Sequence, residues 1–325
     1  RTPRRERSLV DRRRMPRAPK TTQRARGGGP PAPVPLAPPA PGPYRAGVPE
    51  LPEVETVRRM LDERVRGRRI RAVALSGLGL REPVPAGLAR RLRGRAVRRV
   101  DRLGKYLLVR LDGGLTLLSH LGMTGRWLLP DRGGWPESRH LHVRVTFSDG
   151  TRLCYEDARR FGLLRLVPTR EVARDPALAR LGPDPVAEPP TGGSLRAAAA
   201  GSRVAVKTFL LDQRRIAGLG NIYASEVLHR SGVDPRRRTG GLSAAEWARV
   251  AAAIRRVLAA AIARQGTTVS DYRTVGNEPG GYGPMLRVYD RAGEPCRRCG
   301  GPIRRLVQAG RSTYFCPACQ SRHRG

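Results

Sequence analysis

Four cysteines near the end of the chain restrict its fold more than any other feature. Cys296 and Cys299 form one C-x2-C pair, and sixteen residues separate it from the pair Cys316 and Cys319. Two such pairs can place four thiolates around one tetrahedral Zn²⁺. Two disulfides or a redox pair are the alternatives, but the N-terminus lacks the apolar segment of an export signal. We therefore predict one structural zinc ion on a short β-hairpin, because four protein ligands leave no open position for catalysis.

The charge balance points to a polyanionic partner. The chain has 325 residues, 63 Lys plus Arg against 27 Asp plus Glu, and a formal net charge of +36. Cations placed on phosphates release condensed counterions, so nucleic acid is the simplest partner. The sequence contains no apolar run of membrane-spanning length. We expect a cytoplasmic protein that binds no membrane.

The pattern of residues divides the chain into parts and indicates an α+β fold. Residues 1–47 carry 12 basic and 2 acidic residues with a proline-rich run, and they are expected to be disordered. Residues 48–182 predict one helix and then a sandwich or barrel of antiparallel strands. Residues 183–200 begin as a linker, residues 201–290 are mainly helical, and 291–325 form the cysteine module.

Short β-like runs and two helices account for most of the expected structure. Pro52 suits the first turn of a helix, and Val54, Val57, Leu61 and Val65 form its apolar stripe. A second helix opens at residue 243 with a Ser cap followed by Glu three residues later. Cys154 lies in a strand and is expected in a core. The predicted strands cover residues 69–77, 96–103, 105–112, 115–121, 142–149, 151–157 and 161–167.

Lysine is rare in this arginine-rich chain. Only Lys20, Lys105 and Lys207 are present. A composition that favours Arg replaces Lys wherever any cation suffices, so a retained lysine is a candidate for a role that needs a compact ammonium on a flexible stem. Chance retention is the alternative for each one.

Residues 49–56 read PELPEVET, and here the chain resembles the formamidopyrimidine-DNA glycosylase family of bacterial base-excision repair. Members of that family begin with this octapeptide after an initiator Met that is removed. The resemblance extends to about residue 320. Further matching blocks are GKYLL (104–108), SHLGMTG (119–125), DARRFG (157–162), LGPDP (181–185), GLGNIYASEVL (218–228), QGTT (265–268), VYDRAGEPC (288–296) and RSTYFCPACQ (311–320).

The resemblance implies a fold and a reaction. The fold is an N-terminal β-sandwich followed by a helix–two-turn–helix domain and a zinc hairpin, expected to be a monomer. The N-terminal proline amine attacks C1′ of the damaged nucleoside and forms a Schiff base, which makes Pro49 the nucleophile. Glu50 is then the general acid and base, Lys105 reaches a phosphate beside the lesion, and Glu53 supports the site. A helix-dipole role for Glu53 and a plain surface cation for Lys105 are the alternatives.

The position of Pro49 conflicts with this chemistry. In the printed chain its nitrogen is an amide, which has no lone pair available for attack on carbon. We expect that translation starts at Val48, read as Met, and that removal of this residue exposes Pro49. A genuine basic extension, retained or cleaved, is the alternative.

The family also implies a set of DNA contacts. Met123, Arg159 and Phe161 are expected to fill the gap left by an everted base. The glycine-rich loop of residues 271–285 is expected to close over that base, and a plain surface loop is the alternative. The remaining expected contacts, mainly to phosphates, are His120, His142, Arg203, Lys207, Asn221, Tyr289 and Arg311, with the choice between Arg203 and Lys207 left open.

The expected function is therefore excision of 8-oxoguanine and formamidopyrimidines from double-stranded DNA, followed by β,δ-elimination, with no cofactor besides the structural zinc. Two alternatives remain. One is an endonuclease VIII-like glycosylase for oxidised pyrimidines. The other is a non-enzymatic DNA-binding protein in which the extension keeps Pro49 blocked.

Overall fold

Helix α1 (Leu51–Val65) opens the part of the chain that the computed structural model describes, which comprises residues 48–130, 134–268 and 271–320. The predictions for residues 1–47 lie outside the described residues. The predicted stripe of α1 is buried, with Val54, Val57, Leu61 and Val65 each at most 2% exposed. They pack into the core of the neighbouring strands, so the apolar spacing of three and four residues determines which face of the helix is covered.

Two four-stranded antiparallel sheets form a sandwich around that core. One sheet has the order β1-β6-β7-β5 and the other has the order β2-β3-β4-β8. This confirms the predicted antiparallel sandwich. The strands are β1 (Ile70–Leu75), β2 (Val97–Leu103), β3 (Tyr106–Leu111), β4 (Leu115–His120), β5 (Arg126–Leu128), β6 (Leu141–Phe147), β7 (Arg152–Glu156) and β8 (Leu163–Pro168).

Two short elements of the sandwich were not predicted. Strand β5 has three residues and helix α2 (Leu88–Leu92) has five, too few for a periodic pattern to emerge. Cys154 on β7 is fully buried, as predicted. A 3-10 helix, η1 (Thr169–Arg174), follows β8.

The second half of the chain is mainly helical and has its own core. The elements are α3 (Gly192–Ala198), α4 (Val206–Leu211), α5 (Asn221–Ser231), the 3-10 helices η2 (Thr239–Gly241) and η3 (Gly283–Met285), and α6 (Ala244–Ala263). Ser243 caps α6 by accepting from the Glu246 amide, as the sequence predicts. Helix α3 lies within residues 183–200, so the second half of the expected linker is helical.

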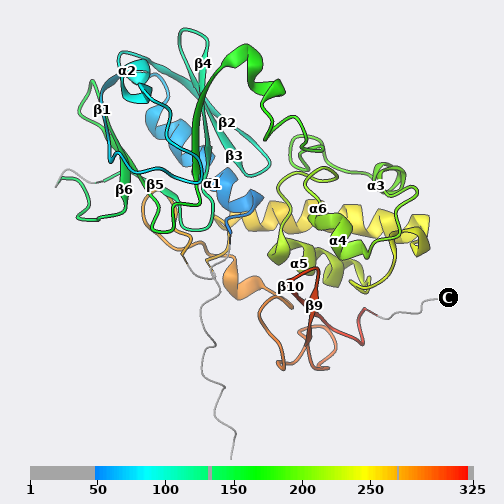
Figure 1. The fold of residues 1–325 in the computed structure, drawn as a ribbon. Coiled ribbons are helices and arrows are strands. Elements are labelled where there is room, and N and C mark those ends of the chain that lie inside the picture. The colour runs from blue at the N-terminus through cyan, green and yellow to red at the C-terminus, as the bar shows by residue number, and fades with distance from the viewer. Residues whose placement is uncertain (1–47, 131–133, 269–270, 321–325) are drawn as a thin grey trace, which may run out of the picture. The chain divides into compact units, whose positions relative to one another are not determined.

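The two halves meet at the start of α1, whose N-terminal end lies near α6 in Figure 1. Leu51 belongs to the helical core, whereas Val54 belongs to the sandwich core. The Leu51 amide donates to the Gly218 carbonyl at 3.1 Å. In return, Tyr272 and Val275 from the helical half are buried in the sandwich core. The first turn of α1 therefore lies where both cores converge.

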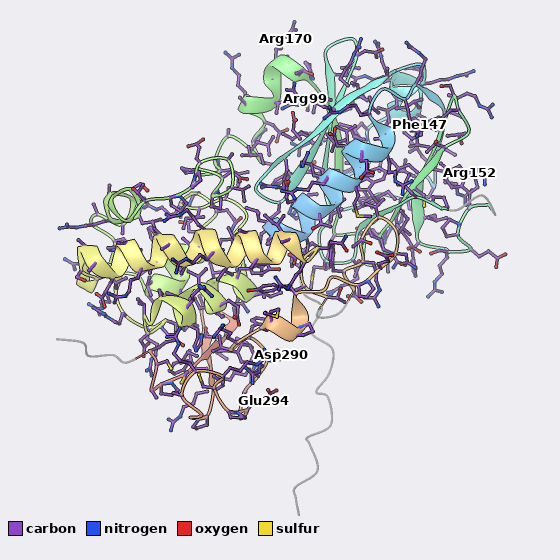
Figure 2. All side chains as sticks on the ribbon, turned by 180° about the vertical axis from the view of Figure 1, so that it is seen from behind. Arg99, Phe147, Arg152, Arg170, Asp290 and Glu294 are labelled. Atoms are coloured by element: carbon purple, nitrogen blue, oxygen red, sulfur yellow. The ribbon has the colours of Figure 1, made fainter. Side chains whose placement is uncertain are left out.

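A β-hairpin of β9 (Arg304–Gln308) and β10 (Arg311–Phe315) closes the described chain. Figure 2 shows the side chains from behind; Phe147 is buried in the sandwich, while Arg99 and Arg170 are exposed on its outside. Within the described ranges, no helix combines the length and the apolar character needed to cross a membrane.

Candidate active site

Glu50 lies at the N-terminus of α5, although the two are far apart in sequence. Its Oε1 accepts from the Ile222 amide at 2.8 Å, and its Oε2 lies 3.4 Å from the Tyr223 amide. Gly220 leaves room for this carboxylate, because a Cβ there would lie 2.5 Å from Oε1. Amides at a helix N-terminus favour a negative charge. Burial nevertheless raises the pKa of Glu50, against the lowering effect of Lys105 and of these amides.

Glu53 lies beside Glu50 and is just as completely surrounded. Its carboxylate accepts from the Glu50 amide at 2.9 Å, from the Thr267 amide at 2.7 Å and from the Tyr223 hydroxyl at 2.5 Å. Burial, and then the charge of Glu50, raises the pKa of Glu53 to about 7. Gly266 leaves room for the Glu53 carboxylate, because a Cβ at this position would lie 2.7 Å from Glu53 Oε1. Its φ of +81° also favours glycine. A proton near neutral pH is thus available within this pair of carboxyl groups.

Lys105 lies in the turn between β2 and β3 and is half-buried. Burial lowers the pKa of its ammonium group, and the charge of Arg311 acts in the same direction. The charges of Glu50 and Glu53 act in the opposite direction. Pro49 is buried and directly precedes Glu50. The structure therefore places Glu50, Glu53 and Lys105 within electrostatic reach of one another, with Pro49 adjacent to Glu50 in the chain.

Met123, Arg159 and Phe161, which are predicted to fill the gap left by an everted base and are called here the wedge residues, lie on two adjoining loops. Arg159 and Phe161 are exposed, with the Arg159 guanidinium 4.8 Å from the centre of the Phe161 ring. Met123 is half-buried on the loop after β4. The two loops touch at Gly122, where a Cβ would lie 2.4 Å from the Phe161 backbone. Buried Asp157 holds both loops, because it accepts from the Thr124 hydroxyl at 2.6 Å and from the Gly162 amide at 2.7 Å.

The two predicted histidines have different surroundings. His120 is half-buried, and its Nδ1 accepts from the Gly122 amide at 2.9 Å, so the neutral ring carries its proton on Nε2. Burial, together with Arg81 and Lys105, lowers the pKa of His120 to about 3. His142 is only 3% exposed, and both of its ring nitrogens have partners: Ser76 Oγ at 3.2 Å and the Asp157 carbonyl at 3.0 Å.

The structure separates Arg203 from Lys207. Arg203 is exposed, whereas Lys207 is 1% exposed. The Lys207 ammonium donates to Asn221 Oδ1 at 2.6 Å, and to the Ser312 carbonyl and the Thr313 hydroxyl, both at 2.8 Å. Burial lowers the pKa of this ammonium to about 7. All three of its donors are used inside the protein, so of these two residues only Arg203 is exposed.

The remaining predicted contacts surround the start of α5. Asn221 Nδ2 donates to the Ser312 carbonyl at 3.0 Å, which ties α5 to the hairpin. Tyr289 is half-buried, with its ring centre 5.1 Å from that of Tyr314. Arg311 is exposed at the start of β10. Asn221 begins the helix whose next two amides lie at the carboxylate of Glu50, so this group of contacts adjoins the Glu50–Glu53 pair, called here the carboxylate cluster.

The four cysteines of the two C-x2-C pairs converge in space. Their sulfur atoms all lie within 4.8 Å of one another, with Cys299 and Cys316 Sγ at 3.5 Å and Cys296 and Cys319 Sγ at 3.9 Å. Four thiolates at this spacing fit the tetrahedral site of a structural Zn²⁺. His229 on α5 adds an outer contact, with its Nε2 3.4 Å from Cys296 Sγ.

Sequence reasoning missed several residues that build the site. Tyr223 and Thr267 bind Glu53, and Asp157 holds the wedge loops. Arg102 and Asp184 bind each other beside Lys105. Each lies in or next to a family block, but no local pattern shows which distant carboxylate or turn it contacts.

Fold and site together define a DNA glycosylase of the helix–two-turn–helix class with a zinc hairpin. Three family models match in order: the formamidopyrimidine-DNA glycosylase N-terminal domain at residues 48–164, the H2TH domain of the same enzymes at 181–273, and the zinc finger found in FPG and IleRS at 293–322. The chain belongs to the formamidopyrimidine-DNA glycosylase family.

Known relatives agree over their full length. The formamidopyrimidine-DNA glycosylases of Caulobacter vibrioides and Methylococcus capsulatus are 43% and 46% identical over 286 and 273 aligned residues, and each match covers 84% of this chain and 100% of the relative. The crystal structure of the MutM (Fpg) protein from Thermus thermophilus has a TM-score of 0.75 at 40% identity, covering 85% of this chain and all of that one. A Lactococcus lactis Fpg variant bound to Fapy-dG DNA has a TM-score of 0.76 at 33% identity, covering 84% and 100%. These matches confirm the predicted family, fold class and structural zinc.

Proposed function

We propose that this protein excises oxidised purines from double-stranded DNA and then cleaves the abasic strand. The observation that carries the proposal is the placement of Glu50. It directly follows Pro49, is buried at the N-terminus of α5 and lies within the electrostatic reach of Lys105. A carboxyl group of raised pKa beside a lysine of lowered pKa is typical of a catalytic site. The basic chain supplies the attraction to DNA phosphates.

The amine of Pro49 is the proposed nucleophile. It forms a bond to C1′ while the bond between C1′ and the damaged base breaks, and the base leaves with that electron pair and takes up a proton. Opening of the sugar leaves an iminium ion on the proline nitrogen, because a secondary amine can form only a cationic Schiff base. This cation accepts electrons in the β- and δ-eliminations that release both phosphates. An α-amine suits the task, since its ordinary pKa of about 7.7–8.0, against about 10.4 for lysine, leaves a much larger fraction of it unprotonated at neutral pH.

The carboxyl pair and Lys105 supply proton transfer and charge. Glu50, whose pKa burial raises, is the proposed general acid and base at the sugar. Glu53 holds the Glu50 backbone and Tyr223 and stores a proton near neutral pH. Lys105, which faces both carboxylates, contacts the phosphate beside the lesion and assists at the sugar.

Met123, Arg159 and Phe161 are the proposed wedge that replaces the everted base. Exposure of Arg159 and Phe161 on adjoining loops supports this role. His120, Arg203, Asn221, Tyr289 and Arg311 are the proposed backbone contacts. His142 and Lys207 are proposed to act from inside: His142 by holding the loop at Asp157, and Lys207 by holding Asn221 against the hairpin.

Borohydride trapping tests this function directly. A protein that begins at Pro49 should form a covalent complex with DNA containing 8-oxoguanine opposite cytosine when the Schiff base is reduced. The same protein with residues 1–48 attached should not, since its Pro49 nitrogen is acylated. Equal crosslinking by both forms would contradict the role of Pro49 and direct attention to another amine, such as Lys105. Mass spectrometry of the native protein then shows whether Pro49 is its N-terminus.

An oxidised pyrimidine is a second candidate substrate, because one solved relative, Lactococcus lactis Fpg, was crystallised with DNA containing an oxidised pyrimidine. The two candidate substrates can be distinguished by how fast each is excised. Single-turnover excision of 8-oxoguanine should exceed that of an oxidised pyrimidine in matched duplexes, and the reverse order would establish endonuclease VIII-like specificity. The proposed location is the bacterial cytoplasm, where the DNA substrate is found.

A further inference from the structure

The turn that carries Lys105 is held by hydrogen bonds to both the amide and the carbonyl of Gly104. Gly104 has a φ of +56° and connects β2 to Lys105. Its amide donates to Asp184 Oδ2 at 2.8 Å, and its carbonyl accepts from Arg102 Nη1 at 3.0 Å. A two-residue turn whose amide and carbonyl both have side-chain partners has little freedom to tilt. The direction in which Lys105 leaves the turn is therefore determined by Arg102 and Asp184.

Arg102 and Asp184 form a buried, two-pronged ion pair. Both side chains are 4% exposed. One guanidinium nitrogen, Nη2, donates to Asp184 Oδ1 at 3.0 Å, and Nη1 also contacts Oδ2. The third nitrogen, Nε, donates to Glu55 on α1 at 3.0 Å. Burial alone would lower the pKa of Arg102, but the hydrogen bonds that it donates to Asp184, and then the charge of Asp184, raise it, so the guanidinium keeps its charge.

Asp184 connects this turn to the helical half of the molecule. Its neighbour Pro183 accepts from the Ala217 amide at 3.0 Å, and the Gly182 amide donates to the Gln213 carbonyl at 2.9 Å. Gly104 itself packs against the same loop, because a Cβ there would lie 3.3 Å from the Gly218 nitrogen. This loop leads directly into α5, whose first amides hold Glu50. One ion pair thus links the Lys105 turn to the support of Glu50.

We propose that Arg102 and Asp184 are positioning residues that hold Lys105 at a fixed place relative to Glu50. A buried ion pair adds little net stability over an apolar pair of the same shape, because the desolvation of two charges offsets their attraction. Its bidentate geometry, by contrast, restricts orientation strongly. The role of the pair in excision rests on the proposed function, but its control of the Lys105 environment does not.

The first test measures Lys105 without any reaction. A protein that begins at Pro49 contains only two lysines, Lys105 and Lys207. Labelling lysine with ¹³C at Cε gives one signal for each, and a Lys105→Arg variant assigns them. In the parent protein, Lys105 should titrate below its ordinary pKa of 10.5, the direction that burial gives. In Asp184→Asn the released turn should admit water and move the Lys105 titration towards that value. The Lys207 signal shows that the helical half remains folded.

The matched control is Asp101, which lies on the same strand as Arg102. Like Asp184, Asp101 on β2 accepts from arginine, here from Arg99 at 3.0 Å and Arg110 at 2.9 Å, but it is partly exposed and does not hold the turn. Asp101→Asn should leave the Lys105 titration unchanged. If Asp184→Asn does not fold, Arg102→Gln removes the bidentate guanidinium contact while Asp184 keeps its backbone amide partners. An unchanged Lys105 titration in the folded Asp184 or Arg102 variant would overturn the proposal.

The second test asks whether the pair acts through Lys105. Asp184→Asn should slow single-turnover excision by about 10- to 100-fold, the size expected from a small misplacement of a catalytic group. In a Lys105→Ala background, the same change should slow excision no further. Fully additive losses would show that the pair acts elsewhere. If the parent excises nothing, the proposed function fails, while the lysine titration still decides whether the pair positions Lys105.

Discussion

The zinc hairpin and the carboxylate cluster each gather polar side chains into a small volume, but over very different distances along the chain. Cys296 and Cys319 are 23 residues apart. Glu50 and its partner amide at Ile222 are 172 residues apart, and Glu53 and Thr267 are 214 apart. The hairpin is a local structure, whereas the cluster exists only when both halves of the chain have folded and met.

This difference has consequences for what stabilises each region. The hairpin core contains few side chains besides its cysteines, so metal ligation must supply much of its folding free energy. The carboxylate cluster lies between two large apolar cores and receives its hydrogen bonds from backbone amides and the Tyr223 hydroxyl. Removal of the metal should therefore affect the hairpin first, and changes in the carboxyl groups should affect chemistry first.

The largest expected effect is on chemistry at the cluster. Glu50→Gln keeps an oxygen for the Ile222 amide but cannot transfer a proton. We expect single-turnover excision to fall by about 10²–10⁴-fold, with binding to an abasic-site analogue nearly unchanged. Glu63→Gln, an exposed change on the same helix, is the matched control and should be neutral. Retained excision by the Glu50 variant would show that another group performs the acid–base step.

The next largest effect is on DNA affinity through the hairpin. Cys316→Ser should lose its zinc and unfold the hairpin, which carries Arg311. Affinity for DNA should fall roughly 10- to 100-fold, with a shallower dependence on salt, since phosphate contacts are lost. At saturating DNA, borohydride trapping should persist, because the donors to Glu50 and Glu53 lie outside the hairpin. Zinc content and Kd are the measurements, and Cys154→Ala, which should keep its zinc, is the control. If Cys316→Ser abolished trapping even at saturating DNA, the hairpin would be required for chemistry at the carboxylate cluster as well as for DNA binding.

A third effect concerns the pH dependence of stability at the cluster. The pKa of Glu53 is raised from its ordinary 4.5 to about 7, so the folded protein holds this proton over a range in which the unfolded chain has lost it. The resulting stability is fully present below the lower value and is lost as pH rises towards the upper one. Between about pH 5 and about pH 8, the Glu53→Gln variant should gain up to about 3 kcal/mol in unfolding free energy relative to the parent. Urea denaturation at the two pH values measures this gain, and a constant difference would contradict the raised pKa.

The same contrast explains how much could be predicted from the sequence. The four zinc ligands follow from spacing alone, since each C-x2-C pair is a local turn. The apolar stripe of α1 and the cap at Ser243 are also local patterns, and the structure confirms them. The family blocks predicted Glu50 and Lys105 as site residues but not what holds them.

The parts that could not be predicted depend on contacts between distant segments. No periodicity indicates that Tyr223 binds Glu53 or that Asp184 holds Gly104. A match to a family block does not show whether a residue contacts DNA or another part of the protein. Lys207 illustrates this limit: it was an expected phosphate contact, with the choice between it and Arg203 left open, whereas its three donors are used by Asn221, Ser312 and Thr313.

Lys207 also provides the smallest predicted effect, because it joins the two regions. Its ammonium connects the start of α5, which holds Glu50, to strand β10 of the hairpin. Lys207→Met keeps the length of the stem but removes the donor to Asn221 Oδ1 and to the Thr313 hydroxyl, while the Ser312 carbonyl still accepts from Asn221 Nδ2. We expect a cost of about 1–2 kcal/mol in unfolding free energy near neutral pH. Burial lowers the pKa of this ammonium to about 7, so the folded parent binds fewer protons than the unfolded chain up to the ordinary value of 10.5. Parent stability should therefore rise relative to the variant as pH increases through this range, which thermal unfolding can follow. Equal stability of parent and variant at every pH would mean that the hairpin and the cluster are coupled by other contacts.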